Sequence, residues 1–154
     1  MAKSMNTKMT RAIAALLCSA ACGLAALPAA AQQTGSLLVE FQGPGGHSNG
    51  AYGRTSAVHA AGRSLLKLKA AGLPAGAYRV SGLNGGNSVN SIASDARYTV
   101  TLTAADAAAL QAMTAQVDAA VKAGVEAENT FRNVKEGDLT GGAPATIRYT
   151  ITPR

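Results

Sequence analysis

The sequence predicts an α+β fold in which two helices cover one face of a four-stranded antiparallel sheet. Four segments alternate apolar and polar side chains, as strands with one covered face do. Two other segments repeat apolar side chains every three or four residues, which indicates amphipathic helices. Their order is strand, helix, strand, strand, helix, strand. This βαββαβ order predicts a ferredoxin-like two-layer sandwich, with the first and third strands central if both crossovers are right-handed.

The four strands are expected over residues 36–42, 77–83, 95–103 and 145–152. The first places Leu37, Val39 and Phe41 on one side, and the third alternates most clearly. Residues 32–35, which precede the first strand, are expected to be a flexible terminus. The second and fourth strands would lie at the edges of the sheet, where exposed backbone groups need protection or a partner.

The first helix is expected over residues 56–71, where four apolar side chains share one face. Thr55 or Ser56 can supply the N-cap, because a hydroxyl oxygen can accept a hydrogen bond from a free backbone N–H. Gly72 follows the helix, where a residue in the left-handed conformation is often needed. These signals define both ends of the helix.

The second helix is expected to begin after Thr103-Ala104-Ala105-Asp106 and to end near Ala127. The four residues resemble a capping box, in which a carboxylate reaches back toward the cap. Apolar residues then recur at helical spacing from Leu110 onward. Residues 129–143 are polar and contain glycine, so they are expected to form a loop.

The first 31 residues have the layout of a secretory signal peptide. Basic residues without any acid precede Ala12, and an apolar run continues to Leu27. Small residues then favour cleavage after Ala31, which leaves residues 32–154 as one domain in the periplasm or outside the cell. A membrane anchor and a lipoprotein attached through Cys22 are the alternatives, although about 16 apolar residues are few for a span of roughly 20.

Cleavage would change the cysteine content and the charge. Cys18 and Cys22 would leave, so neither disulfides nor thiolate chemistry are expected in the remaining chain. Three of the 14 basic residues would also leave, and 11 would remain against eight acidic residues, a net charge of +3. This low charge does not indicate nucleic-acid binding, and no membrane association is expected after cleavage. Arg63, Lys67 and Lys69 are expected to form a solvated helix face.

A glycine-rich loop, Gly43-Pro44-Gly45-Gly46-His47-Ser48-Asn49-Gly50, follows the first strand. It lacks the lysine and the spacing of a phosphate-binding loop. His47 and His59 have no cysteine or close carboxylate to complete a metal site, so neither a metal nor a cofactor is expected. Ser48 beside His47 does not form a nucleophilic pair by adjacency alone. His47 can present a ring N–H to a bound group, or it is an exposed histidine without a role. His59 is expected to be a packing or boundary residue.

Two motifs at separate places in the chain carry a family resemblance. The first is the Gly-Gly-His-Ser segment with Tyr52-Gly53-Arg54 and Ser56-Ala57-Val58-His59-Ala60 after it. The second is Gly85-Gly86-Asn87-Ser88-Val89-Asn90-Ser91-Ile92-Ala93. Together they resemble the dimerisation (lid) domain of the zinc exopeptidase family, which includes glutamate-releasing carboxypeptidases, acetylornithine deacetylase, succinyl-diaminopimelate desuccinylase and tripeptidase-like enzymes. The likeness covers about residues 36–152 in matching element order.

The resemblance implies the same sandwich fold and the pairing of two copies through an edge strand and the adjoining helix. It implies that His47 contacts the substrate carbonyl and the developing oxyanion in a partner's active site, and that Asn90 helps to hold the substrate. The residues expected to support these loops are Gly45, Gly46, Ser48, Gly85 and Gly86. The family's catalytic domain, with two zinc ions and a general-base glutamate, has no counterpart in this sequence. The chain alone is therefore not expected to hydrolyse peptides.

The sequence thus predicts an exported, non-catalytic interaction module that forms a homodimer. One alternative is an accessory subunit that supplies His47 in trans to a full-length exopeptidase. Another is a module that binds a peptide or carboxylate ligand. A remnant of a disrupted peptidase gene is the fourth interpretation.

Overall fold

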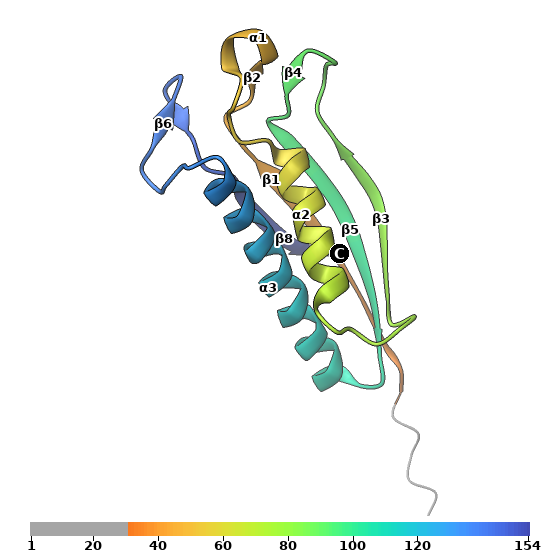
Figure 1. Cartoon of the computed structure of the whole chain (residues 1–154). Helices are drawn as coiled ribbons and strands as arrows, with labels where there is room; N and C mark the ends of the chain where they lie inside the picture. Colours follow the sequence, from red (N-terminus) through yellow and green to blue (C-terminus); the bar gives the residue numbers. More distant parts are fainter. Residues whose placement is uncertain (1–30) are drawn as a thin grey trace, which may run out of the picture.

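The computed structural model describes residues 31–154, which form a two-layer α+β sandwich (Figure 1). The antiparallel sheet consists of β1 (Gln33–Gln42), β3 (Tyr78–Gly85), β5 (Asp95–Ala104) and β8 (Arg148–Pro153). Its strand order is β3-β5-β1-β8, which confirms the predicted central and edge strands. Apart from Ala31, the expected signal peptide lies outside the described residues.

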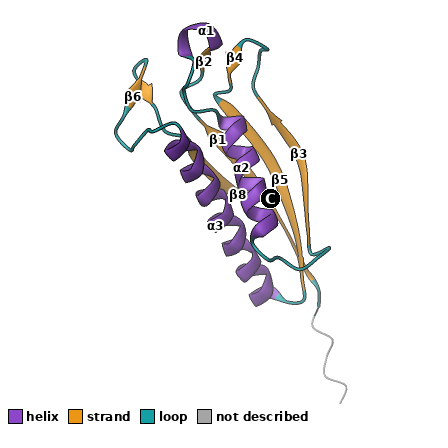
Figure 2. Ribbon diagram, in the orientation of Figure 1, coloured by secondary structure: helices purple, strands orange, loops and turns teal. Residues whose placement is uncertain are grey.

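Two helices, α2 (Ala57–Ala70) and α3 (Ala107–Phe131), cover the same face of the sheet (Figure 2). The alternating apolar residues of the central strands point toward these helices, as the sequence predicts. The largest buried apolar side chains between the two layers are Val39, Phe41, Tyr98, Val100 and Leu102 from the sheet and Leu68, Val117 and Val121 from the helices. Neither helix in this part of the chain is long and apolar enough to cross a membrane.

Short elements gather at one end of the sandwich, at the top of Figure 1. They are β2 (Gly46–His47), α1 (Ser48–Ala51), β4 (Ser91–Ile92), β6 (Leu139–Thr140) and β7 (Ala143–Pro144). β2 pairs with β4, and β6 pairs with β7. The expectation of a loop over residues 129–143 was therefore wrong in part, because this segment contains the end of α3 and a small hairpin.

The first and last strands differ from their predicted limits. The expected flexible terminus at residues 32–35 belongs largely to β1, because β5 extends to Ala104 and pairs with Gln33. The last strand begins at Arg148 and not at residue 145. Residues 145–147 bond elsewhere, since Thr55 Oγ1 donates to the Ala145 carbonyl at 2.6 Å.

The ends of α3 also correct the sequence prediction. Asp106 is itself the N-cap, and its carboxylate accepts a hydrogen bond from the Ala109 amide at 2.8 Å, so the expected capping box from Thr103 is wrong. The helix continues past Ala127 to Phe131. Its last turn is held against α2 by the buried Glu128 side chain, which local spacing of apolar residues does not reveal.

The two helices approach each other closely where Gly124 of α3 faces Ser64 of α2. A Cβ atom on Gly124 would lie 2.4 Å from the Ser64 backbone nitrogen. The Ser64 hydroxyl donates to the Ala61 carbonyl at 2.7 Å and lies 2.8 Å from the Tyr98 hydroxyl, so Tyr98 donates to Ser64 and both buried hydroxyls are hydrogen-bonded. Burial raises the pKa of Tyr98 to about 12, although the bond to Ser64 opposes this shift.

Candidate functional site

The two sequence motifs meet at the end of the sandwich that carries the short elements. β2 and β4 pair with Gly46 opposite Ile92 and His47 opposite Ser91. The backbone N–H of Ser48 donates to the Asn90 carbonyl at 2.9 Å. This small ladder fixes the glycine-rich loop to the asparagine-containing loop, so residues 43 positions apart in the sequence become neighbours.

The first loop can be built only with glycine at two positions. Gly46 has a φ angle of +141°, and a Cβ atom there would lie 2.6 Å from the Ala51 Cβ. Gly45 has a φ angle of +63°, and its Cβ would lie 2.8 Å from the Ser94 Cβ. Side chains at these positions would force the loop away from α1 and from the second loop. A side chain at either position would therefore require its neighbours to move.

Gly85 and Gly86 stand at the point where the second loop leaves β3. A Cβ atom on Gly85 would lie 2.6 Å from the Asp95 carbonyl oxygen, because β3 and β5 approach closely there. Gly86 follows with a φ angle of +75° and donates its N–H to the same carbonyl at 3.2 Å. This turn directs the chain toward Asn90.

The His47 ring is held from both sides. Its Nδ1 accepts a hydrogen bond from the Asn49 amide at 3.2 Å, so in the neutral ring the proton lies on Nε2. The Asn90 side-chain amide lies 3.1 Å from Nε2. Since an N–H can donate only to an acceptor, Asn90 must turn its oxygen toward His47, and its Nδ2 then faces the Ser88 hydroxyl. His47 and Asn90 thus form one hydrogen-bonded pair.

This pair is open to solvent. His47, Ser48 and Asn90 are all exposed, and Val89 beside them is fully exposed. In this arrangement the Nε2–H donates to Asn90, so a carbonyl oxygen or an oxyanion would accept that hydrogen bond in place of Asn90, and the Asn90 amide has a second N–H to donate. Ser48 contributes its backbone and makes no side-chain hydrogen bond within residues 31–154. In the same part of the chain, no three His, Cys, Asp or Glu side chains are grouped closely enough to hold a metal.

Two residues that support the site were not among the predicted ones. Arg54, which follows α1 in the chain, donates from Nη1 to the Gly45 carbonyl at 3.1 Å and so stabilises the first loop. Ser88 contacts the Asn90 side chain and positions it. Both residues lie within the two motifs that carry the family resemblance, and this was the signal in the sequence for a role at the site. Their spacing alone does not show which atoms they contact.

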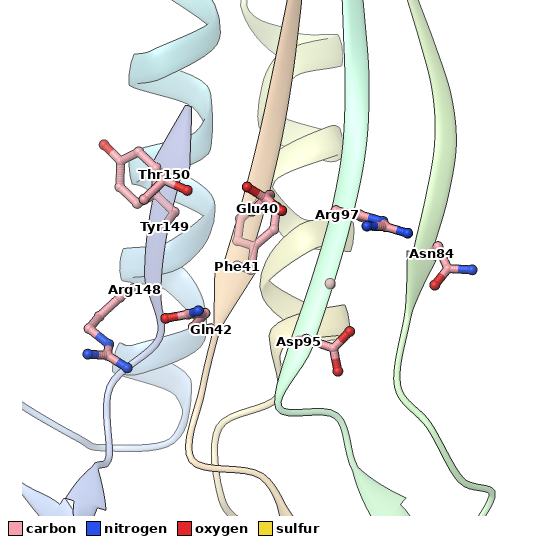
Figure 3. Close-up of a pocket in the computed structure, with 10 residues that line it drawn as sticks. Glu40, Phe41, Gln42, Asn84, Asp95, Arg97, Arg148, Tyr149 and Thr150 are labelled. Atoms are coloured by element: carbon pink, nitrogen blue, oxygen red, sulfur yellow. The ribbon is translucent and has the colours of Figure 1, made fainter. Parts of the chain in front are cut away.

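A separate hollow of about 570 Å³ lies on the uncovered face of the sheet (Figure 3). Its lining includes Glu40, Asp95, Arg97 and Arg148, which come from β1, β5 and β8. The two acidic and two basic side chains balance in charge. The hollow does not include His47 or Asn90, and it is distinct from the candidate site.

Comparison with known structures identifies the same architecture in larger proteins. A hydantoinase/carbamoylase family amidase from Burkholderia ambifaria matches with a TM-score of 0.63 and 21% identity, over 82% of this chain and 28% of that one. An aminobenzoyl-glutamate utilization protein from Klebsiella pneumoniae matches with a TM-score of 0.58 and 21% identity, over 83% and 31%. The aminopeptidase PepT from Bacillus cereus matches with a TM-score of 0.56 and 12% identity, over 79% and 29%. The chain thus spans less than a third of the length of each, and the likeness shows a shared fold.

The sandwich and its paired loops therefore define a domain of the kind found within amidases and peptidases. The model of the peptidase dimerisation domain family matches residues 32–129, more than half of the sequence. The chain belongs to this family. No curated protein matches the sequence significantly.

Proposed function

We propose that this protein is an exported, non-catalytic interaction module that forms a homodimer through the β3 edge of its sheet. Membership of a dimerisation domain family supports self-association or pairing with a full-length peptidase. The observation that carries the proposal is the unpaired edge. Within residues 31–154, β3 and β8 each pair on one side only, so each has a free row of backbone groups.

Exposed apolar side chains favour the β3 edge over the β8 edge. Leu83 of β3 is 52% exposed, and Leu66 of α2 is 70% exposed. α2 contacts β3, whereas α3 contacts β8, so the elements that carry these two leucines form the same flank of the sandwich. The β8 strand has no large apolar side chain with comparable exposure. A second copy at β3 would extend the sheet and cover apolar surface.

Sedimentation of the protein at micromolar concentration tests this proposal. We expect a dimer whose dissociation depends on concentration, since the edge supplies backbone hydrogen bonds and the leucines supply buried apolar area. A strictly monomeric species at these concentrations would contradict self-association.

Export is the second part of the proposal, and it is motivated by the layout of residues 1–31. Mass spectrometry of the protein recovered from the periplasm or the medium should show Gln32 as the first residue. Protein that is found only in the cytoplasm and retains Met1 would contradict export.

The exposed pair of His47 and Asn90 favours one other candidate function, an accessory role in trans. The exposed ring N–H, which Asn90 holds by a hydrogen bond, could exchange Asn90 for a substrate carbonyl that another polypeptide binds. Adding the protein to a full-length exopeptidase of this family should then change peptide turnover. His47→Ala should abolish the change, whereas Lys122→Ala, which alters an exposed side chain of α3, should retain it. Equal effects of the two variants, or no effect of the wild-type protein, would exclude this role.

A further inference from the structure

A buried carboxylate joins the two helices at a place that the candidate site does not use. Glu128 of α3 is fully buried. Its Oε1 accepts hydrogen bonds from the Ser56 amide at 3.2 Å and from Arg132 Nε at 3.3 Å. Its Oε2 accepts a bond from Arg63 Nε at 2.9 Å. Ser56 is the N-cap of α2. In many helices a glutamate at the third position of the same helix accepts the hydrogen bond of the N-cap amide. Here Glu128 of α3 accepts that bond instead.

Both arginines are anchored through Nε, which leaves their terminal nitrogens available. Within residues 31–154, Nη1 and Nη2 of Arg63 and Nη1 of Arg132 make no hydrogen bond. The two guanidinium carbons lie 4.7 and 5.0 Å from the centre of the Phe131 ring. Phe131 is 65% exposed, and the side chains of Arg63 and Arg132 beside it are 35% and 21% exposed, so both reach the protein surface only in part. Their orientation is therefore fixed without the use of their outer donors.

His59 adds a third donor to this surface. Its side chain is 57% exposed, so of the two roles expected for His59, packing or boundary, the packing role was wrong. Arg132 Nη2 lies 3.4 Å from His59 Nδ1, and since Arg132 can only donate, Nδ1 is the acceptor. In the neutral ring the proton then lies on Nε2, which makes no hydrogen bond within residues 31–154. The expectation that Arg63 belongs to a merely solvated face was also wrong, because Arg63 is paired with Glu128.

The charges and donors at this surface select for a negative ligand. Two guanidinium groups stand against one carboxylate, and Glu128 is the only carboxylate in the described chain within 4.0 Å of either one. Both oxygens of Glu128 are occupied and buried, so the surface offers donors and no carboxylate acceptor. An oxyanion matches such donors because guanidinium groups bind its oxygens in a two-pronged geometry.

We propose that Arg63, Arg132 and His59 form a binding site for a small oxyanion, a carboxylate or a phosphate, with Phe131 as its platform. The site explains why a fully buried glutamate and a largely exposed phenylalanine lie together. It is independent of dimerisation through β3 and of the role of His47, since none of its residues belongs to those surfaces.

The direct test is an NMR titration of the protein with acetate and, separately, with inorganic phosphate. We expect saturable shifts in the Nε–Hε signals of Arg63 and Arg132 and in the His59 ring. Sodium chloride at matched ionic strength is the control, because general screening acts equally on all exposed charges. A stronger response to acetate would indicate a carboxylate ligand, and a stronger response to phosphate would indicate a phosphate ligand. Equal shifts with chloride would overturn the proposal.

Two variants distinguish the effect of the paired guanidinium donors of Arg63 from the effect of positive charge alone. Arg63→Lys keeps the positive charge but loses the outer pair of donors, and we expect it to weaken anion binding by about tenfold. Lys67→Gln removes a charge one helical turn away and should change the affinity by less than about twofold. If Arg63→Lys does not fold, His59→Ala serves instead, because His59 is exposed, and it should weaken binding by about threefold or more. Unchanged affinity in the folded variant, or an equal loss in Lys67→Gln, would exclude the site.

Discussion

Val80→Pro is expected to convert the homodimer into a monomer, while Ile151→Pro leaves the dimer intact. Thr103 N donates to the Ala77 carbonyl at 2.8 Å, so these two residues form a hydrogen-bonded pair of the antiparallel ladder. In an antiparallel ladder, hydrogen-bonded pairs alternate with pairs that share no hydrogen bond, and the residues of the second kind direct their backbone groups away from the neighbouring strand. Val80, three residues further along β3 and opposite Val100, therefore directs its N–H away from β5 and toward the free edge. Proline removes this donor without breaking the ladder inside the chain.

The other edge of the sheet supplies a matched control. Arg154 N donates to the Ser36 carbonyl at 2.8 Å, which places Ile151 in the corresponding outward position of β8. Pro153 already occupies an outward position of the same strand, so proline is compatible with it. Val80 and Ile151 are both half-buried β-branched residues, and the two substitutions change the side chain alike.

Sedimentation of both variants measures the effect. We expect Val80→Pro to weaken the dimer by at least about tenfold, since one backbone bond is lost and the proline ring obstructs a paired strand. Val80→Ala controls for the lost side-chain volume and should remain dimeric. Dissociation by Ile151→Pro alone would assign the interface to β8, and a dimer in all variants would exclude both edges.

The sequence predicted the sandwich because its main elements carry local signals. The alternation from Leu37 to Phe41 and the helical spacing that ends at Leu68 both survive in the structure, since each periodicity reports which side faces the core. Gly72 has a φ angle of +75° after α2, as its position predicted. These features depend on residues that are close together in the chain, so they are visible without the fold.

The features that sequence analysis missed depend on distant residues. Glu128 caps α2 across 72 residues, and this contact extends α3 beyond its predicted end. The pairing of His47 with Asn90 was reachable only through the family resemblance, because nothing in either motif alone indicates the β2–β4 ladder. The proposed oxyanion site was hidden for the same reason: Arg63 lies on α2, Arg132 directly follows α3, and both bind Glu128.

The second large effect is expected from the helix contact, where Gly124→Ala should destabilise the protein by about 3 kcal/mol. The added Cβ would lie 2.4 Å from both the nitrogen and the Cα of Ser64, which are backbone atoms that no rotamer change can move. The two helices must therefore separate, and this weakens the packing above the Ser64–Tyr98 hydrogen bond.

Gly62→Ala is the matched control, because the same substitution in α2 meets nothing within 4 Å. Alanine is the better helix former, so this variant should gain roughly 0.5–1 kcal/mol. Chemical denaturation of both variants should thus give shifts of opposite sign. A small or stabilising effect of Gly124→Ala would mean that the helices do not approach as closely as the Ser64 contact requires. The opposite signs matter because ordinary helix propensity favours alanine at both positions, and only the contact between α2 and α3 can reverse that preference at Gly124.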